Sequence, residues 1–412
     1  MNSNKFFLKI INRYSPKNPD TKKYPLLENA FSNSDILKGI NVLLSRRITM
    51  SQITKRFEAQ FGKFIGSKYC LMVNSGSSAN LLALFALINP KKKNRLKAGD
   101  ECLVPAVCWS TSLWPIIQSG LRPRFIDVDL NTFSPSLKII KKSVNKKTKA
   151  VMLLNILGNC SEIDSIRNFL YKKKIYLIED TCEALGSKYK NKYLGTFGDF
   201  GTFSFYYSHQ ITSGEGGMII CKNQSDYKIL HSLRAHGWDR GLKNSKNNNF
   251  NFINSGFNLR PLDLNAAIAS SQLKRINQFK KIRSDNRSKI IKNLQNSNKW
   301  NNQFTFFEPI KNLDPSWFGL PLLINKKYIL KKNKFLNYLN RNGIETRPIL
   351  SGNFVNQSSI KLYKINYNLK TLKNSQEIEE RGFFIGLPTQ SISLKKLKNL
   401  TLSLLNIDKI RC

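Results

Sequence analysis

Short apolar runs alternate with longer stretches of helical periodicity over the first half of the chain. Apolar runs predict strands at 68–74, 101–106, 122–129, 149–157 and 175–180, and the intervening periodicity predicts helices at 77–88, 109–118 and 161–174. Strands that alternate with helices are typical of a mostly parallel sheet covered by helices on both faces. The pattern therefore predicts an α/β fold.

Polar residues gather where three of the apolar runs end. "NSGSSAN" follows Val73, "EDTCE" follows Ile178, and "SHQ" follows Tyr206. Binding sites in parallel sheets open at the carboxyl ends of the strands. We therefore expect these three clusters to meet at one site.

The pattern changes after about Lys281 to longer amphipathic stretches rich in lysine and asparagine. We interpret this change as a second, smaller α/β domain. The predicted organisation is an N-terminal arm at 1–45, a large domain at 46–285 and a small C-terminal domain at 286–412.

Composition supports a folded protein with an uneven charge. The chain has 412 residues, of which 41% are hydrophobic, and its 67 Lys and Arg against 26 Asp and Glu give a formal charge of +41. A core of useful size is therefore available. The basic residues are dispersed and no groove-reading motif accompanies them, so solvated surface lysine is favoured over a polyanion site, and we expect no nucleic-acid partner.

The cysteines and the first residues of the chain indicate the cellular compartment of the protein. Seven cysteines form no CxxC pair, and most lie inside apolar runs, where a reduced thiol is the ordinary state. The opening "MNSNKFFLKIINRYSPKNPD" has too short an apolar stretch for a signal peptide, and no later segment approaches a membrane span. These features predict a cytoplasmic protein without a membrane partner.

Three residues in or near these clusters are candidates for binding a phosphorylated, planar ligand. Ser77 lies at a predicted helix start, where backbone N–H groups favour phosphate, although a plain helix cap explains it equally well. Asp180 ends a predicted strand and needs a cationic partner such as a protonated ring nitrogen, or it caps the next segment. Trp109 offers an aromatic face or packs in the core.

Together the motifs resemble the DegT/StrS type of sugar aminotransferases that depend on pyridoxal 5'-phosphate (PLP). The resemblance rests on "VNSGSSAN", "EDTCEALGSKYKNKYLGTFGDFGTFSFY", "GEGGMI" and "GFNLRPLDLNAAIASSQL", in that order. It implies the aspartate-aminotransferase-like fold, PLP fold type I. It also implies cofactor-binding roles for Gly76, Ser77 and Ser204 at the phosphate, Trp109 on the ring, Asp180 at the ring nitrogen, and Asn258 at the phosphate of a neighbouring subunit. Glu183, three residues past Asp180, is a candidate for orienting the cofactor oxygen or the substrate.

Some of these implied roles have simple alternatives. Glu183 also fits a first-turn helix charge. The role of Asn258 requires a homodimer with shared active sites.

One position departs from the family pattern. The family has a lysine before the "GEGG" bend, of the form K-N-[IL]-x-x-G-E-G-G, and this chain has His209 there. A lysine amine condenses with the cofactor aldehyde, whereas an imidazole can only move protons. We expect Lys188, Lys190 and Lys192 to lie in a surface hairpin and not to replace it. The cofactor would then be held without a covalent bond, with His209 as the catalytic base.

The same histidine marks the 3-dehydratases of nucleotide-linked 4-keto-6-deoxysugars. "LRAHGWDR" and "GIETRPILSGNF" resemble the branch that acts on GDP-4-keto-6-deoxymannose. No cysteine lies between Cys221 and Cys412, so a four-cysteine iron–sulfur cluster of the kind found in CDP-sugar relatives is not expected, nor any other metal.

The resemblance implies a reaction and its partners. L-Glutamate converts PLP to the pyridoxamine form, His209 removes a proton from the cofactor methylene, and the C3 hydroxyl of the sugar leaves, giving a 3,6-dideoxysugar for lipopolysaccharide O-antigen. His236, Arg260 and Arg347 are substrate candidates, with a packed loop histidine and structural ion pairs as alternatives. An aminotransferase that makes an aminosugar and a noncatalytic sugar-binding homologue remain open.

Overall fold

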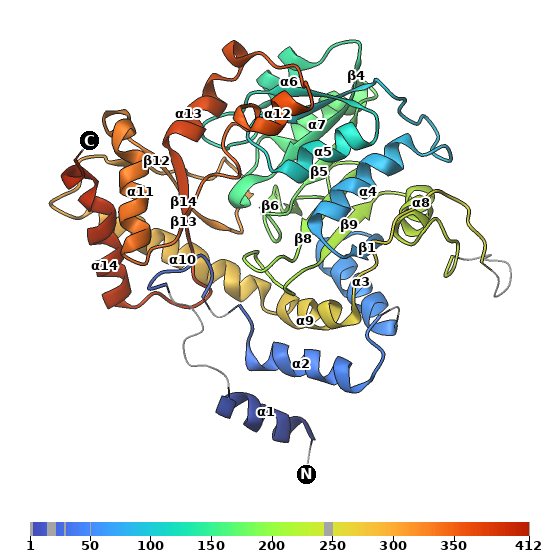
Figure 1. Ribbon diagram of the computed structural model, residues 1–412, viewed down its shortest axis with the longest axis horizontal. Coiled ribbons are helices and arrows are strands. Elements are labelled where there is room, and N and C mark those ends of the chain that lie inside the picture. The colour runs from blue at the N-terminus through green and yellow to red at the C-terminus, as the bar shows by residue number, and fades with distance from the viewer. Residues whose placement is uncertain (1–2, 15–21, 29, 50, 243–249, 412) are drawn as a thin grey trace.

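The central element is a seven-stranded sheet, whose strands lie between the middle and the top of Figure 1, right of centre. The computed structural model describes residues 3–14, 22–28, 30–49, 51–242 and 250–411. The strand order is β1 (Tyr69–Val73), β9 (Gly217–Cys221), β8 (Phe200–Ser204), β5 (Tyr176–Asp180), β4 (Thr148–Leu154), β2 (Glu101–Pro105) and β3 (Arg122–Ile126). In this sheet β9 alone runs against the other strands, so the predicted mostly parallel sheet is confirmed.

Helices bury both faces of this sheet, because alternate strand residues point to opposite sides. One face packs on α4 (Gly76–Ile88), α5 (Ser110–Gln118) and α8 (Gln224–Arg234). The other face packs on α3 (Gln52–Ile65) and α9 (Asp263–Leu273) near β1 and β9, and on α6 (Leu137–Ser143) and α7 (Ile163–Lys172) near β4 and β5. The helices predicted at 77–88, 109–118 and 161–174 correspond to α4, α5 and α7.

The C-terminal part forms its own layer around a four-stranded antiparallel sheet, drawn in orange and red on the left of Figure 1. The strand order is β10 (Phe304–Thr305), β12 (Gly319–Ile324), β14 (Gly382–Gly386) and β13 (Thr346–Arg347). Side chains of α10 (Ile276–Gln295), α11 (Lys332–Arg341) and α14 (Leu394–Leu405) complete its core. Because α10 crosses residue 285, the exact domain limits stay a prediction.

The remaining elements surround these two layers. They are α1 (Ser3–Tyr14), α2 (Asn33–Leu44), α12 (Ser358–Leu362) and α13 (Lys373–Arg381), the small sheet of β11 (Leu313–Asp314), β6 (Lys188–Tyr189) and β7 (Lys192–Tyr193), and the 3₁₀ turns η1 (Ile156–Gly158), η2 (Lys326–Lys331), η3 (Phe354–Asn356), η4 (Leu369–Thr371) and η5 (Asn406–Lys409). Figure 1 places α1 and α2 below the sheet. The β6–β7 pair confirms the predicted lysine-rich hairpin.

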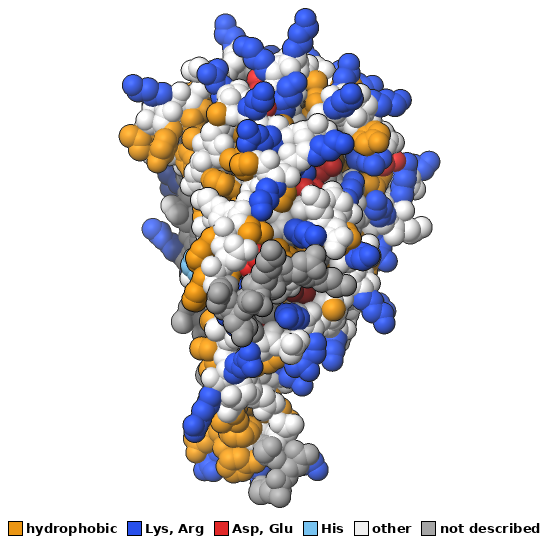
Figure 2. Space-filling view, turned by 90° about the vertical axis from the view of Figure 1, so that its right-hand side faces the viewer, with side chains coloured by type: hydrophobic (Ala, Val, Ile, Leu, Met, Phe, Trp, Pro, Cys, Tyr) orange, Lys and Arg blue, Asp and Glu red, His pale blue; other side chains and the backbone are white. Residues whose placement is uncertain are grey.

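Figure 2 shows Lys and Arg side chains scattered over the visible face, with few acidic side chains between them. This distribution agrees with solvated surface lysine on that face. No helix in the described part of the chain is long and apolar enough to cross a membrane. Among the same residues, no three His, Cys, Asp or Glu side chains gather as metal ligands would.

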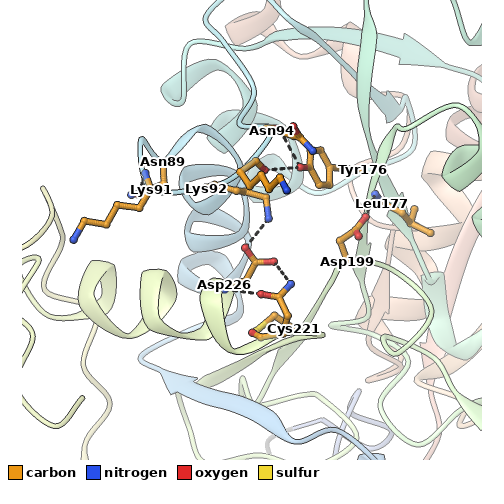
Figure 3. Close-up of polar contacts among 11 residues, drawn as sticks. Asn89, Lys91, Lys92, Asn94, Tyr176, Leu177, Asp199, Cys221 and Asp226 are labelled. Atoms are coloured by element: carbon orange, nitrogen blue, oxygen red, sulfur yellow. Dashed lines mark hydrogen bonds and ion pairs between the residues drawn. The ribbon is translucent and has the colours of Figure 1, made fainter. Parts of the chain in front are cut away.

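A buried ion pair lies at the edge of the sheet where strands β5 and β8 begin (Figure 3). Lys92 Nζ lies 2.5 Å from Asp226 Oδ1, and the two side chains are 8% and 6% exposed. The ammonium also lies 5.1 Å and 5.4 Å from the ring centroids of Tyr176 and Phe200, the first residues of β5 and β8. The loop after α4 is thereby fixed to α8 and to the sheet.

Replacing Lys92 by Met should lower the free energy of unfolding by about 3–5 kcal/mol, because Asp226 then stays buried without its cation. Urea unfolding measures this loss. The neighbouring Lys93 is exposed, so Lys93→Met is the matched control and should shift stability by less than about 0.5 kcal/mol. Equal unfolding midpoints for the two variants would contradict a stabilising role for the pair.

Candidate active site

A cavity of about 640 Å³ opens at the carboxyl ends of the central strands. Its wall contains most of the predicted site residues, namely Gly76, Ser77, Trp109, Asp180, Glu183, Ser204, His209 and Arg347. The three polar clusters that follow separate apolar runs therefore do meet at one place, as their positions at strand ends predict.

At the start of α4, different serine residues serve for helix capping and for ligand binding, two roles that the sequence alone did not distinguish. Ser75 caps the helix, since its Oγ accepts the Ser78 N–H at 3.1 Å, and Ser78 donates its hydroxyl to Asn74 Oδ1 at 2.6 Å. Ser77 instead is exposed in the cavity wall, with its hydroxyl donated to Thr111 Oγ1 at 3.2 Å. The cap therefore uses Ser75 and Ser78, and Ser77 is available to a ligand together with the first N–H groups of the helix.

At Gly76 the backbone lies so close to Ser204 and Cys182 that a residue with a side chain would not fit. A Cβ atom at Gly76 would lie 2.6 Å from Ser204 Cβ and 2.9 Å from Cys182 Sγ. The helix start is therefore pressed against the end of β8, and this contact brings the Ser77 and Ser204 hydroxyls to the same side of the cavity.

Gly76→Ala should weaken PLP binding by about tenfold, because the added methyl group pushes the helix start away from Ser204. Titration of the apoprotein with PLP, followed by absorbance, measures the affinity. Gly214→Ala is a useful control, because nothing lies within 4 Å of a Cβ at Gly214, which also has a positive φ of 82° and so tests strain without crowding. An unchanged PLP affinity in Gly76→Ala would rule out this packing as a determinant.

Asp180 is fixed by neighbours that sequence reasoning missed. Asp180 is only 7% exposed. Its Oδ2 atom accepts hydrogen bonds from Asn80 Nδ2 and Ser112 Oγ, both at 2.8 Å. Thr202 donates its hydroxyl to Asn80 Oδ1 at 2.6 Å, which fixes the Asn80 amide with its NH₂ group toward Asp180.

The second carboxylate oxygen of Asp180 has a weaker partner. Oδ1 accepts the Cys182 N–H at 3.2 Å, so Asp180 caps the turn that follows it as well as lining the cavity. No basic side chain of the described chain forms an ion pair with it. A cationic ring nitrogen would therefore find an oriented carboxylate.

Glu183 lies in the cavity wall near Asp180. Its Oε2 accepts the Leu157 N–H at 3.0 Å. Burial, and to a smaller extent the charge of Asp180, raise the pKa of Glu183 to about 7 against the effect of this hydrogen bond. The alternative of a first-turn helix charge is wrong, because residues 181–187 form turns and not a helix.

His209 lies in the turn after β8, with its ring edge-on to two aromatic rings. The ring centroids of Tyr206 and Phe318 are 5.9 Å and 5.1 Å away. Its Nδ1 atom is buried and has no hydrogen-bond partner in the described chain. Burial, together with the positive charge of Arg283, lowers the pKa of His209 to about 3. The imidazole is therefore neutral between pH 5 and 8, so one of its two ring nitrogens is unprotonated.

Lysine is absent from the wall of this cavity as far as the chain is described. Lys188, Lys190 and Lys192 belong to the β6–β7 hairpin, where Lys190 pairs with Asp164 at 2.6 Å. In the described wall of the cavity, no amine therefore stands in for the one that His209 replaces.

Trp109 and Arg347 complete the wall from two different layers. Trp109, the residue before α5, is 50% exposed, so the alternative of core packing is wrong. Arg347 lies on β13 and pairs with Glu345 at 2.6 Å, but its side chain stays 52% exposed and faces the cavity. Arg347 therefore has both the structural ion pair and the accessible guanidinium that the sequence left as alternatives.

Three predicted residues lie elsewhere. Asn258, Arg260 and His236 are not part of the described cavity wall. Asn258 and His236 are exposed, and Arg260 Nε donates to Asn258 Oδ1 at 3.0 Å. Their roles in cofactor or substrate binding stay predictions.

The residues of the cavity fit PLP. Gly76, Ser77 and Ser204 form a tight, anion-accepting corner, Asp180 presents an oriented carboxylate, and Trp109 offers a half-exposed aromatic face. This set of groups matches a phosphate, a protonated ring nitrogen and a planar ring.

The fold and this cavity define an aminotransferase-like protein of PLP fold type I. A model of the DegT/DnrJ/EryC1/StrS aminotransferase family matches residues 32–399. The chain belongs to this family, which confirms the resemblance found in its motifs.

Among similar proteins, GDP-4-keto-6-deoxy-D-mannose 3-dehydratase of Escherichia coli O55:H7 is 38% identical over 375 residues, which is 88% of this chain and 95% of that protein. The lipopolysaccharide biosynthesis protein RfbH of Salmonella typhimurium is 34% identical over 360 residues, 82% of each chain. A crystal structure of GDP-4-keto-6-deoxymannose-3-dehydratase with a trapped PLP-glutamate geminal diamine has a TM-score of 0.85 and 35% identity, covering 93% of this chain and all of that one.

Proposed function

We propose that this protein is a PLP-dependent dehydratase that removes the C3 hydroxyl of a GDP-linked 4-keto-6-deoxysugar. The observation that supports the proposal most strongly is the cavity itself, where a neutral histidine occupies the family's lysine position and no lysine lines the described wall. The similarity to the E. coli dehydratase points to the same reaction.

Residues of one chain hold the cofactor in this proposal. Gly76, Ser77 and Ser204 bind its phosphate, Trp109 packs on its ring and Asp180 pairs with its nitrogen. When bound, PLP supplies a carrier for the amino group of L-glutamate and an electron-accepting ring. Asp180 keeps that ring protonated, because its carboxylate is already oriented by Asn80 and Ser112.

His209 moves the protons. Its neutral imidazole takes a proton onto a ring nitrogen at the start of elimination and returns one to the departing C3 hydroxyl. Because an imidazole does not form the covalent bond that a lysine amine would, the amino group is lost as ammonia at the end. The net change converts the sugar nucleotide and glutamate to the 3,6-dideoxy-4-ketosugar, 2-oxoglutarate and ammonia.

A homodimer is part of the proposal. Asn258 is exposed and outside the described wall of its own cavity, as a residue that serves a neighbouring site must be. Trp109 and Tyr206 leave half of their large side chains exposed at the cavity, 50% and 49%. In such a dimer, Asn258 would reach the cofactor phosphate of the partner subunit. The similarity to RfbH supports a place in lipopolysaccharide synthesis.

Product analysis tests the function. Purified protein is incubated with PLP, L-glutamate and GDP-, CDP- or dTDP-linked 4-keto-6-deoxysugars, and the products are separated and weighed by mass spectrometry. We expect ammonia and a GDP-sugar with one oxygen atom fewer. A stable aminosugar would instead show an aminotransferase, and no conversion of the cofactor absorbance with glutamate would show a noncatalytic protein.

A further inference from the structure

One arginine is buried without an acidic partner. Arg283 on α10 is 1% exposed and is the largest of the fully buried side chains. Its guanidinium donates to two backbone carbonyls, Leu387 at 3.1 Å and Trp317 at 3.3 Å. No carboxylate of the described chain pairs with it. A buried charge of this kind is costly.

The segment held by Arg283 leads to the catalytic turn. Residues 316–318 precede β12, and two of them touch the turn of His209: Gln210 Nε2 donates to Ser316 O at 3.2 Å, and the Phe318 ring packs edge-on against the imidazole at 5.1 Å. Trp317, between them, accepts the hydrogen bond from Arg283. The guanidinium therefore holds the middle of the segment whose two ends fix His209 and its neighbour.

We propose that Arg283 is a positioning residue for His209: by anchoring the 316–318 segment it holds Phe318, and through Phe318 the imidazole, in the working orientation. The inference rests on the proposed role of His209. A hydroxyl or amide anchor would bind the same carbonyls, but Arg283 also brings a permanent positive charge behind the ring.

That charge acts against protonation of the imidazole. The titratable groups that share the cavity wall with His209 are Asp180, Cys182, Glu183, Tyr206, Glu215 and Arg347, and Arg283 lies behind it. After burial, the charge of Arg283 is the other effect that lowers the pKa of His209. The resident cation therefore opposes protonation of the imidazole before the reaction begins.

Arg283→Met removes both the anchor and the charge. We expect kcat to fall by about 10- to 100-fold while the KM for the sugar nucleotide changes by less than about twofold, because a misplaced base affects the chemical step. We also expect the titration midpoint of His209 to rise. The midpoint is followed by NMR of the protein labelled at its three histidines, with the His209 signal assigned from His209→Asn.

Three further variants complete the test. Arg283→Gln lacks the charge and serves if the Met variant does not fold, whereas Arg283→Lys keeps the charge and should restore the low midpoint. Arg381→Met is the matched control: Arg381 on α13 is also buried and donates to a backbone carbonyl, Ile324 at 2.7 Å, but that carbonyl lies at the far end of β12 from residues 316–318. It should leave the midpoint and kcat unchanged.

Two results would overturn the inference: an unchanged His209 signal and kcat in the Arg283→Met or Arg283→Gln variant, or the same changes in Arg381→Met. The NMR titration needs neither substrate nor turnover, so it still tests the role of Arg283 if the wild-type protein fails to dehydrate the sugar. That second failure would refute the proposed function instead.

Discussion

His209→Asn lowers the rate of C3 dehydration by about 10²- to 10⁴-fold and leaves PLP affinity close to that of the wild type. The rate falls because asparagine cannot take up a proton at neutral pH, which is the contribution of a general base. Affinity stays because the groups proposed to hold the cofactor, Ser77, Asp180 and Ser204, are other side chains of the cavity wall, which the substitution leaves unchanged. Stopped assays for ammonia and PLP titration measure the two effects separately.

The pH dependence provides a check on the same residue. Because the pKa of His209 is lowered to about 3, the base is already neutral at pH 5, and its own ionisation should not reduce activity between pH 5 and 8. His231→Asn is the control, because His231 lies on α8 outside the described cavity wall, and it should keep the wild-type base chemistry. Dehydration at the wild-type rate in His209→Asn would show that another group is the base.

Asp180→Asn is expected to have the second large effect. The value of kcat/KM should fall by about 10- to 100-fold, because the variant loses the charge-assisted hydrogen bond to the cofactor ring nitrogen. Asn80 and Ser112 both donate to one oxygen of Asp180, so the new amide will turn its own oxygen toward them. Its NH₂ group then faces the place of the ring nitrogen and disfavours the protonated ring.

The measurement for Asp180→Asn combines PLP binding with the rate of ammonia release. Asp164→Asn is the matched control, because that carboxylate pairs with Lys190 in the surface hairpin. It should behave as the wild type in both assays. Wild-type binding and turnover in Asp180→Asn would contradict the assignment of Asp180 to the cofactor nitrogen.

Local sequence patterns were sufficient to predict the sheet and the place of the site. Apolar runs bounded by polar residues defined the strands, and a strand end fixes where the following side chain lies, so Asp180 and the cluster around Ser77 could be brought together without a structure. The motif resemblance added the identity of the cofactor and the meaning of His209, which spacing alone does not provide.

The supports of the site were harder to predict, because they come from residues distant in the chain. Asn80 gave a weak signal as a polar side chain in an otherwise apolar helix, and it meets Asp180 across 100 positions. Arg283 and Phe318 gave no signal in the sequence, because their links to the turn of His209 depend on how the C-terminal layer packs. For Glu183, only the alternative of a first-turn helix charge was wrong, because turns and not a helix follow β5.

The six cysteines of the described residues have the reduced form that the sequence predicted, and Cys412 lies outside those residues. Cys70, Cys102, Cys108, Cys160, Cys182 and Cys221 are free thiols, and burial raises the pKa of each. The absence of an iron–sulfur cluster and the cytoplasmic location stay predictions.

Reduction with borohydride in the presence of PLP tests the central claim most directly, because it converts any imine between PLP and a lysine into a permanent pyridoxyl adduct. Peptide mapping by mass spectrometry then finds the modified residue. The account predicts no stoichiometric adduct in the wild-type protein and one at position 209 in His209→Lys. A stoichiometric pyridoxyl group on a native lysine of the wild-type protein would contradict it.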